Sequence, residues 1–225
     1  MTGRPSSSTS LIAMLDPGVL AFVRESLPPA PLRVLEVGAG SGELAEALAD
    51  AGYEVYAIDP ASTSESVHVV AMADLRDPPD SFDAAVAIVS LHHIEPLLES
   101  CRRLAEVVRP GGTLVLDEID VARLDERATS WWLEHHDTVE HGDGEHVPGT
   151  PEEIVAFMRH HIHDLLKIQE ALGEWFDLGP PVRGSYLYRW ELPPELRGTE
   201  EELIGAGRLP AIGVRIVGTR KPVPA

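Results

Sequence analysis

The chain has 225 residues, 44% of them hydrophobic, a composition and length that suit one α/β domain. Acidic residues outnumber basic ones by 37 to 18 and give a formal net charge of −19. This charge argues against a nucleic-acid substrate, because phosphate binding relies on clustered Lys and Arg. No apolar run approaches the ~20 residues of a membrane helix, and the single cysteine, Cys101, fits a reducing cytoplasm. We therefore expect a cytoplasmic protein with a small-molecule substrate and neither nucleic acid nor membrane as a partner.

Apolar runs alternate with helix-like segments over the first half of the chain, a pattern typical of βαβ units with a parallel sheet. The continuous apolar run from Ala84 to Val89 predicts a central strand that is covered on both faces. Helices are expected from Glu43 to Ala51 and from Glu95 to Val108. The predicted strands of this half are 33–37, 54–59, 67–70, 82–90 and 113–119.

The second half of the chain has a different character. Residues 120–150 are too short to hold a core of their own, so we interpret them as a substrate-side insertion or lid. Thr150 as N-cap and Pro151 at the first position predict a helix that runs to about Leu172. A short helix at 199–206 is expected between two late strands, 183–191 and 213–220. We thus predict a single domain over residues 1–225, in which residues 1–15 form a loose terminus.

The segment from Val34 to Ala45 reads as a buried strand, a glycine-rich turn and the start of a helix. Its spacing is E-x-G-x-G-x-G, with Glu43 where a dinucleotide fingerprint would have its third glycine. That difference points away from NAD and toward a smaller nucleoside cofactor without a pyrophosphate. Glu36, just before the turn, is expected to orient the loop or to receive the ammonium of an amino-acid ligand.

A second predicted strand, which starts near Glu54, ends in an acid, Asp59, 17 residues after Gly42. A carboxylate at this place can accept hydrogen bonds from both ribose hydroxyls, as in NAD enzymes. The alternative is that Asp59 is only a turn residue before Pro60. Together with the glycine turn, ribose binding is the favoured interpretation.

Five motifs in order now carry a resemblance: Val34–Ala45, Ile58-Asp59, Ser81-Phe82-Asp83, Leu91-His92-His93-Ile94 and Arg109-Pro110-Gly111-Gly112. This set resembles the class I S-adenosylmethionine-dependent methyltransferases, in particular those that act on small molecules. The resemblance covers residues 30–120 in motif detail. It implies a Rossmann-like α/β fold with a seven-stranded, mostly parallel sheet, helices on both faces, and a last strand that inserts antiparallel.

The resemblance also assigns cofactor-binding residues. It implies that the ribose lies at Asp59 and that the family's adenine-binding Asp corresponds to Ala71 here. Met72 would then cover the adenine face, and Asp74 is a candidate for the missing carboxylate. Methionine-side contacts are expected from Glu36, Gly38, Ala39 and Gly40, and further cofactor contacts from Pro60, Ala87 and His92.

Histidines supply the candidate bases. Methyl transfer to a hydroxyl or ammonium requires the loss of a proton, and His93 lies at the sheet edge where open α/β sheets bind ligands. The alternative for His93 is simple packing in the loop. Seven of the ten histidines fall between 135 and 163, a density that raises the idea of a metal site. Their spacing fits no ligand pattern, so we assign no metal and take His136 as the second candidate base.

Three functions remain open from the sequence alone. The first is methyl transfer from S-adenosylmethionine to an O, N or C nucleophile of a small organic molecule. The second is a relative that binds the cofactor without methylating, as a rearrangement catalyst or a partner subunit. The third, an NAD-dependent oxidoreductase, is disfavoured by Glu43. The oligomeric state and the identity of the acceptor are not predicted.

Overall fold

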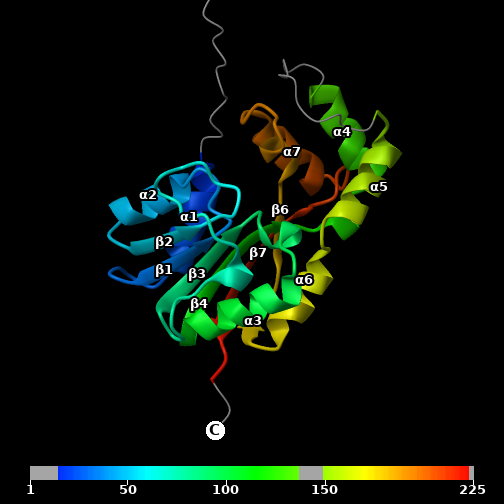
Figure 1. The fold of residues 1–225 in the computed structure, drawn as a ribbon. Helices are drawn as coiled ribbons and strands as arrows, with labels where there is room; N and C mark the ends of the chain where they lie inside the picture. Colours follow the sequence, from blue (N-terminus) through cyan, green and yellow to red (C-terminus); the bar gives the residue numbers. More distant parts are fainter. Residues whose placement is uncertain (1–14, 137–148, 223–225) are drawn as a thin grey trace, which may run out of the picture.

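The fold was analysed in a computed structural model, which describes residues 15–136 and 149–222. Its centre is a mixed sheet in the order β2-β1-β3-β4-β7-β5, in which β6 also pairs with β7 (Figure 1). The strands are β1 (Arg33–Val37), β2 (Glu54–Ile58), β3 (Phe82–Ile88), β4 (Val108–Ile119), β5 (Phe176–Leu178), β6 (Val182–Gly184) and β7 (Gly213–Arg220). β1 to β4 pair in parallel, and β7 runs antiparallel to β4, β5 and β6. The predicted mostly parallel sheet with an inserted antiparallel strand is confirmed.

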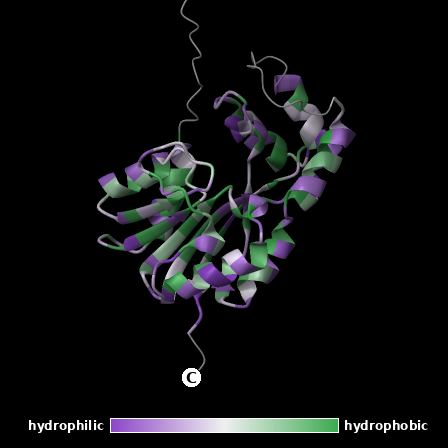
Figure 2. Cartoon of the chain, viewed as in Figure 1, coloured by the Kyte–Doolittle hydropathy of each residue, from purple (hydrophilic) through white to green (hydrophobic). Residues whose placement is uncertain are grey.

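The side chains of successive strand residues contribute to two apolar clusters, one on each face of the sheet. On β1, Val34 packs with α1 (Pro17–Ser26) and α2 (Glu43–Asp50) on one face. Leu35, the next residue, packs on the other face with α3 (Leu97–Val107) and α6 (Leu165–Gly173). Successive side chains of a strand point to opposite faces, so a strand with apolar residues throughout is buried on both. In Figure 2 the strands are mostly green, whereas the helices turn many purple residues outward.

A third apolar cluster lies beyond the carboxyl end of the sheet. It is built by η3 (Val121–Arg123), α4 (Glu126–His136), α5 (Pro151–His161), η4 (Leu187–Arg189) and α7 (Leu196–Gly205). Trp132 is fully buried there; its indole N–H donates to the carbonyl of Trp190 at 2.7 Å, and the two rings stack. Figure 1 shows α4, α5 and α7 gathered on one side of the molecule. Within the described ranges, none of the helices has both the length and the apolar character that spanning a bilayer demands.

The predicted strand at 67–70 is not formed. Its residue His68 makes one isolated bridge to Ile58, at the end of β2. The chain then turns at Ala71 into η1 (Met72–Asp74), so no ladder can continue. This prediction was wrong because an apolar run does not reveal whether a partner strand accompanies it.

The predicted strand at 183–191 is also shorter than expected, since β6 ends at Gly184 and the chain enters η4. The Glu200 carboxylate accepts hydrogen bonds from the backbone N–H groups of Tyr186, Leu187 and Tyr188. A β-strand would use these backbone N–H groups to pair with a neighbouring strand. Here the buried Glu200 carboxylate accepts their hydrogen bonds instead, so the strand does not continue.

The single helix predicted from Pro151 is two helices. Thr150 and Glu153 form the expected capping box of α5, and Pro151 stands at the first position. The break comes at Asp164, whose carboxylate accepts the backbone N–H of Lys167 at 2.8 Å and caps α6. Two elements, α1 and β5, were not predicted; Asp16 and Pro17, which cap and open α1, were available as a signal.

Candidate cofactor site

The glycine turn between β1 and α2 adopts the backbone conformation that its sequence suggests. Gly38 and Gly40 have φ angles of +74° and +54°, in the left-handed region that favours glycine. A Cβ on Gly38 would lie 2.3 Å from the Cβ of Ser90, because the loop after β3 approaches closely. A Cβ on Gly40 would meet nothing within 4 Å. The absence of a side chain at Gly38 therefore allows the loop after β3 to pack against the turn, whereas Gly40 borders open space.

Asp59 joins this turn to the end of β2. Its carboxylate accepts the backbone N–H of Gly40 at 3.0 Å and that of Ala61 at 2.8 Å. Ser62 adds a second link, since its hydroxyl donates to the Gly40 carbonyl at 2.6 Å. Each carboxylate oxygen has two lone pairs, so both can still accept from a ligand hydroxyl. Asp59 is thus a loop-positioning residue as well as a candidate ribose-binding residue.

A cavity of about 370 Å³ opens at this edge of the sheet, a volume within the range typical of small-molecule sites. It is lined by Val37, Gly38, Ile58, Asp59, Pro60, Val70, Ala71, Met72, Val89, Ser90, His93, Ile94, Glu95 and Ser100. Six of the predicted site residues are among them: Gly38, Asp59, Pro60, Ala71, Met72 and His93. The other predicted residues lie outside this lining: Glu36, Ala39, Gly40, Ala87, His92 and His136.

Glu36 lies under the glycine turn and is 4% exposed. Burial raises the pKa of its carboxyl to about 8, while the backbone N–H of Ala45 acts in the opposite direction. Its Oε2 atom has no hydrogen-bond partner among the described residues. This oxygen can accept a hydrogen bond from an ammonium group or from a water molecule. Glu36 therefore fits a ligand that has an amino-acid end.

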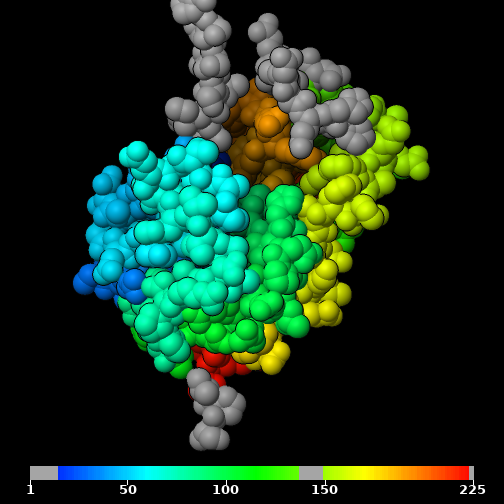
Figure 3. Space-filling view, in the orientation of Figure 1, coloured from blue at the N-terminus to red at the C-terminus, as the bar shows by residue number. Residues whose placement is uncertain are grey.

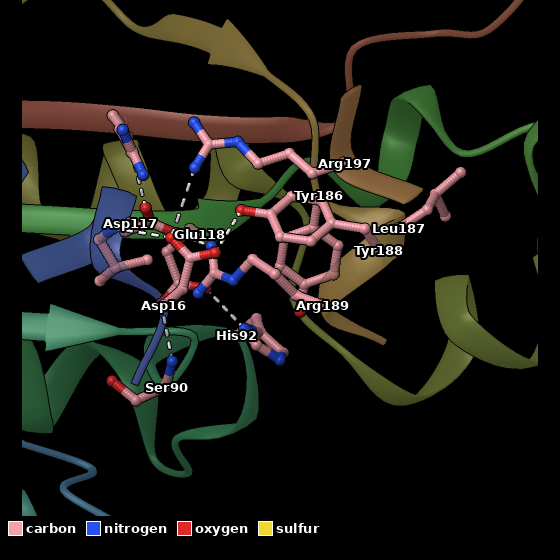
Figure 4. A network of polar contacts seen from close by, with 12 residues as sticks. Asp16, Ser90, His92, Asp117, Glu118, Tyr186, Leu187, Tyr188, Arg189 and Arg197 are labelled. Carbon is pink, nitrogen blue, oxygen red and sulfur yellow. Dashed lines mark hydrogen bonds and ion pairs between the residues drawn. The ribbon is translucent and has the colours of Figure 1, made fainter. Parts of the chain in front are cut away.

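The loop after β3 carries the candidate base and is held by a buried carboxylate (Figure 4). Val89 has a φ of +52°, a strained conformation for a β-branched residue. The backbone N–H groups of Ser90 and Leu91 donate to Oε1 of Glu118, at 3.0 and 2.7 Å. Nδ1–H of His92 donates to Oε2 of the same carboxylate at 2.6 Å. His92 is therefore a buried structural partner of Glu118 rather than a residue of the cavity wall.

His93 follows in η2 (Leu91–His93) and lines the cavity. Its ring lies 4.1 Å from the ring of His92, centroid to centroid. Partial burial and the neighbouring His92 lower the pKa of His93 below its ordinary value, against the opposing influence of Glu118. A lowered pKa keeps the imidazole neutral at pH 7, which is the form that a general base requires.

Two further acids organise the carboxyl end of the sheet, and sequence reasoning missed both. Asp117 on β4 binds Arg189 of η4 at 2.5 Å (Figure 4) and Arg215 of β7 at 2.8 Å. Glu200 on α7 is fully buried and caps η4 through the three backbone donors described above. These contacts join η4 to β4 and β7, and α7 to η4. No local pattern identifies such carboxylates, because their partners are distant in sequence.

The described histidines of residues 135–163 lie in different places, and of His136 and His163 only His163 contacts residues of the cavity lining, Ile94 and Glu95. His136 is buried on α4, where its ring packs on that of Trp132. His163 lies between α5 and α6; its Nε2 is 3.1 Å from the carbonyl oxygen of Ile94. Two of the seven histidines, His141 and His146, fall outside the described residues. In the part of the chain that the structure describes, no three His, Cys, Asp or Glu side chains are placed to hold a metal ion.

Comparison with known proteins gives the family. A methyltransferase domain family matches residues 13–153, which include every residue of the cavity lining. The chain belongs to this methyltransferase domain family. The family predicted from the five motifs is thereby confirmed.

Curated relatives of this methyltransferase-family chain carry a more specific name. The ubiquinone biosynthesis O-methyltransferase of Xanthomonas campestris pv. campestris is 37% identical over 123 residues, which are 47% of this chain and 51% of that protein. The chain therefore spans about half the length of the curated relatives that it matches.

Solved structures share the fold of this methyltransferase-family chain. An S-adenosylmethionine-dependent methyltransferase from Mesorhizobium loti aligns with a TM-score of 0.59 at 15% identity, over 90% of this chain and 96% of that one. The [4+2]-cyclase SpnF aligns with a TM-score of 0.56 at 18% identity, over 92% and 81%. At such identities the likeness shows a common fold, and the Rossmann-like methyltransferase fold predicted from the sequence is confirmed.

Proposed function

We propose that this protein transfers a methyl group from S-adenosylmethionine to an oxygen, nitrogen or carbon nucleophile of a small organic molecule. The observation that carries the proposal is that Gly38 of the glycine turn, Asp59 and His93 line the same cavity. Family membership and the name of the curated relatives support the same reaction. That name makes an oxygen acceptor the first to test.

Each part of the cavity edge has a role in this proposal. Glu36 and the turn from Gly38 to Gly40 hold the amino-acid end of the cofactor, and Asp59 holds the ribose hydroxyls. Pro60, Ala71 and Met72 pack on the nucleoside, whose apolar surroundings are lined by Ile58 and Val70. We retain Ala87 and His92 as residues that support this wall from behind, since both are buried. The bound cofactor would supply an activated methyl group.

The remaining chemistry falls to residues that orient the acceptor and move its proton. His93 accepts the acceptor's proton at a ring nitrogen, in the neutral form that its lowered pKa favours. Alignment of the nucleophile and exclusion of water account for most of the remaining acceleration. His136 is the weaker candidate for the base, because it lies among the aromatic residues of α4.

We further propose that residues 1–225 act as one domain whose segment 120–150 covers the acceptor side. The apolar cluster that packs η3, α4 and α5 against η4 and α7 supports this arrangement, and Figure 3 shows α7 (orange) set back between the N-terminal segments in blue and cyan and α5 in yellow-green. The net charge of −19 supports a small-molecule partner over a nucleic acid. The buried thiol of Cys101, whose pKa burial raises to about 12, is consistent with the reducing cytoplasm that we propose as its location.

Two measurements test the proposal. Isothermal titration calorimetry with S-adenosylhomocysteine should show binding, whereas NADH should not bind. Incubation with S-adenosylmethionine that carries a labelled methyl group and a panel of phenols, amines and activated carbon acids should give a labelled product. If S-adenosylhomocysteine does not bind, the assignment of S-adenosylmethionine as the cofactor is refuted. Binding without transfer to any acceptor would instead favour the non-methylating alternative, which the family match and the curated relatives do not favour.

A further inference from the structure

One side chain of the cavity has an unsatisfied polar atom. Ser100, on the first turn of α3, is 2% exposed and lines the cavity. Its Oγ is buried and has no hydrogen-bond partner among the described residues. Buried hydroxyls are nearly always paired, since an unpaired one costs free energy. The Ser100 hydroxyl therefore needs a partner that the protein itself does not provide.

The other serine of the lining behaves differently. Ser90 donates its hydroxyl to the carbonyl of Val37 at 2.8 Å, so it is satisfied within the protein. A helical serine can also donate its hydroxyl to the carbonyl four residues earlier, which here belongs to Pro96. That carbonyl accepts the backbone N–H of Ser100 at 3.0 Å, but the Ser100 hydroxyl makes no such bond. The unpaired hydroxyl thus belongs to one wall of the cavity and is not general to its serines.

This wall lies where α3 packs against η1, at the end of the cavity that we assign to the adenine. Four other residues of the lining, Val70, Ala71, Met72 and Ile94, have no side-chain oxygen or nitrogen. Glu95, which follows Ile94 in the lining, is 73% exposed, and its carboxylate pairs with His163 at 3.2 Å. Asp74, a candidate for the carboxylate missing at Ala71, does not take that role. Its side chain is 72% exposed, is 4.0 Å from Arg76 and is not part of the cavity lining.

We propose that the Ser100 hydroxyl is the side-chain group that hydrogen-bonds the polar edge of the adenine ring, in place of the carboxylate that Ala71 lacks. A hydroxyl both donates and accepts, so it can pair with a ring nitrogen or with the exocyclic amino group. It also brings no charge next to the apolar side chains of Val70, Met72 and Ile94, whereas a buried carboxylate would have to be desolvated. This inference rests on the proposed function, because it requires an adenosyl ligand.

The test measures affinity for two ligands that share only the adenosine part. Calorimetric dissociation constants are determined for S-adenosylhomocysteine and for adenosine, with the wild type and with Ser100→Ala. We expect the variant to bind both ligands about 3- to 10-fold more weakly, as the loss of one neutral hydrogen bond implies. The unliganded variant should melt no lower than the wild type, because alanine favours the helix and no internal hydrogen bond is lost.

Ser81→Ala is the matched control. Its hydroxyl donates to the carbonyl of Pro78 at 2.7 Å, and Ser81 is not among the lining residues. Both dissociation constants should stay at the wild-type value in this variant. A wild type that binds no S-adenosylhomocysteine would refute the proposed function itself.

Three results would overturn the inference while the proposed function stands. The first is wild-type affinity in Ser100→Ala for both ligands. The second is a loss for S-adenosylhomocysteine but not for adenosine, which would move the hydroxyl away from the adenine. The third is a lower melting temperature of the unliganded variant, which would make the hydroxyl a structural group.

Discussion

Glu118 and His92 form a buried pair at the carboxyl edge of the sheet, with Oε2 of Glu118 2.6 Å from Nδ1 of His92 and side chains that are 1% and 3% exposed. The second oxygen of Glu118 accepts the backbone N–H groups of Ser90 and Leu91. One carboxylate on β4 thereby fixes the loop that follows β3. Figure 4 shows this pair, and since His93 is the next residue of the loop, the pair also fixes the position of the candidate base.

Removal of this carboxylate should destabilise the protein. Glu118→Ala leaves three buried donors unpaired, and we expect the free energy of unfolding to fall by about 3 kcal/mol or more. Glu118→Gln keeps one acceptor oxygen for the backbone, so its loss should be smaller. Equilibrium unfolding in urea measures both. The control is Glu99→Ala on the exposed face of α3, which should stay within about 0.5 kcal/mol of the wild type. Equal stability of Glu118→Ala and the control would contradict the assignment.

His93 should affect turnover more than binding. We expect His93→Gln to lower kcat by about 100-fold, the lower end of what a positioned base contributes, with little change in the affinity for S-adenosylhomocysteine. The pH profile of the wild type gives the second readout. Because the pKa of His93 is lowered from 6.5, turnover should rise with pH along an acid limb whose midpoint lies below pH 6.5. A midpoint above pH 6.5, or a variant that loses cofactor affinity, would exclude His93 as the base.

Local sequence signals were sufficient for the first half of the fold and for much of the cavity. The apolar strand, the glycine turn and Asp59 each follow from residues within a few positions of one another, so their placement at one sheet edge could be predicted. Glu118, Glu200 and Ser100 could not. The first two act on backbone donors 12 to 28 residues away, and no periodicity encodes that distance. Ser100 looks like an ordinary helix residue until its missing hydrogen bond is seen.

Asp59 should affect both stability and cofactor affinity. Asp59→Ala removes the acceptor of two backbone N–H groups, those of Gly40 and Ala61, and we expect it to cost about 1–2 kcal/mol of unfolding free energy. It should also weaken S-adenosylhomocysteine binding at least 10-fold, because the turn and the ribose lose the same carboxylate. Asp59→Asn restores one acceptor oxygen, so it should recover stability more than affinity.

Urea unfolding and calorimetry on the same preparations separate the two effects of Asp59. The control is Asp50→Asn, at the exposed end of α2, which should change neither quantity. Full affinity in Asp59→Ala would show that the carboxylate serves the loop alone.

Glu36 should make the stability of the unliganded protein depend on pH. Burial raises its pKa from 4.5 to about 8, so between these values the folded protein keeps a proton that the unfolded chain has released. The free energy of unfolding contributed by this group is therefore full below pH 4.5 and declines as the pH rises toward 8. One proton corresponds to at most about 1.4 kcal/mol per pH unit.

The substitution Glu36→Gln removes the titrating carboxyl group and keeps a side chain of similar size and shape. We expect its stability relative to the wild type to increase from pH 5 to pH 8 and to level off above pH 8, because a buried glutamine never has to ionise. Urea unfolding at one-unit pH intervals gives the difference, in which the titrations of all other groups cancel. Glu46→Gln, at an exposed position of α2, should show a constant difference. A constant difference for Glu36→Gln as well would mean that the carboxyl is ionised throughout, and that a partner for Oε2 is supplied from within the chain rather than by the cofactor.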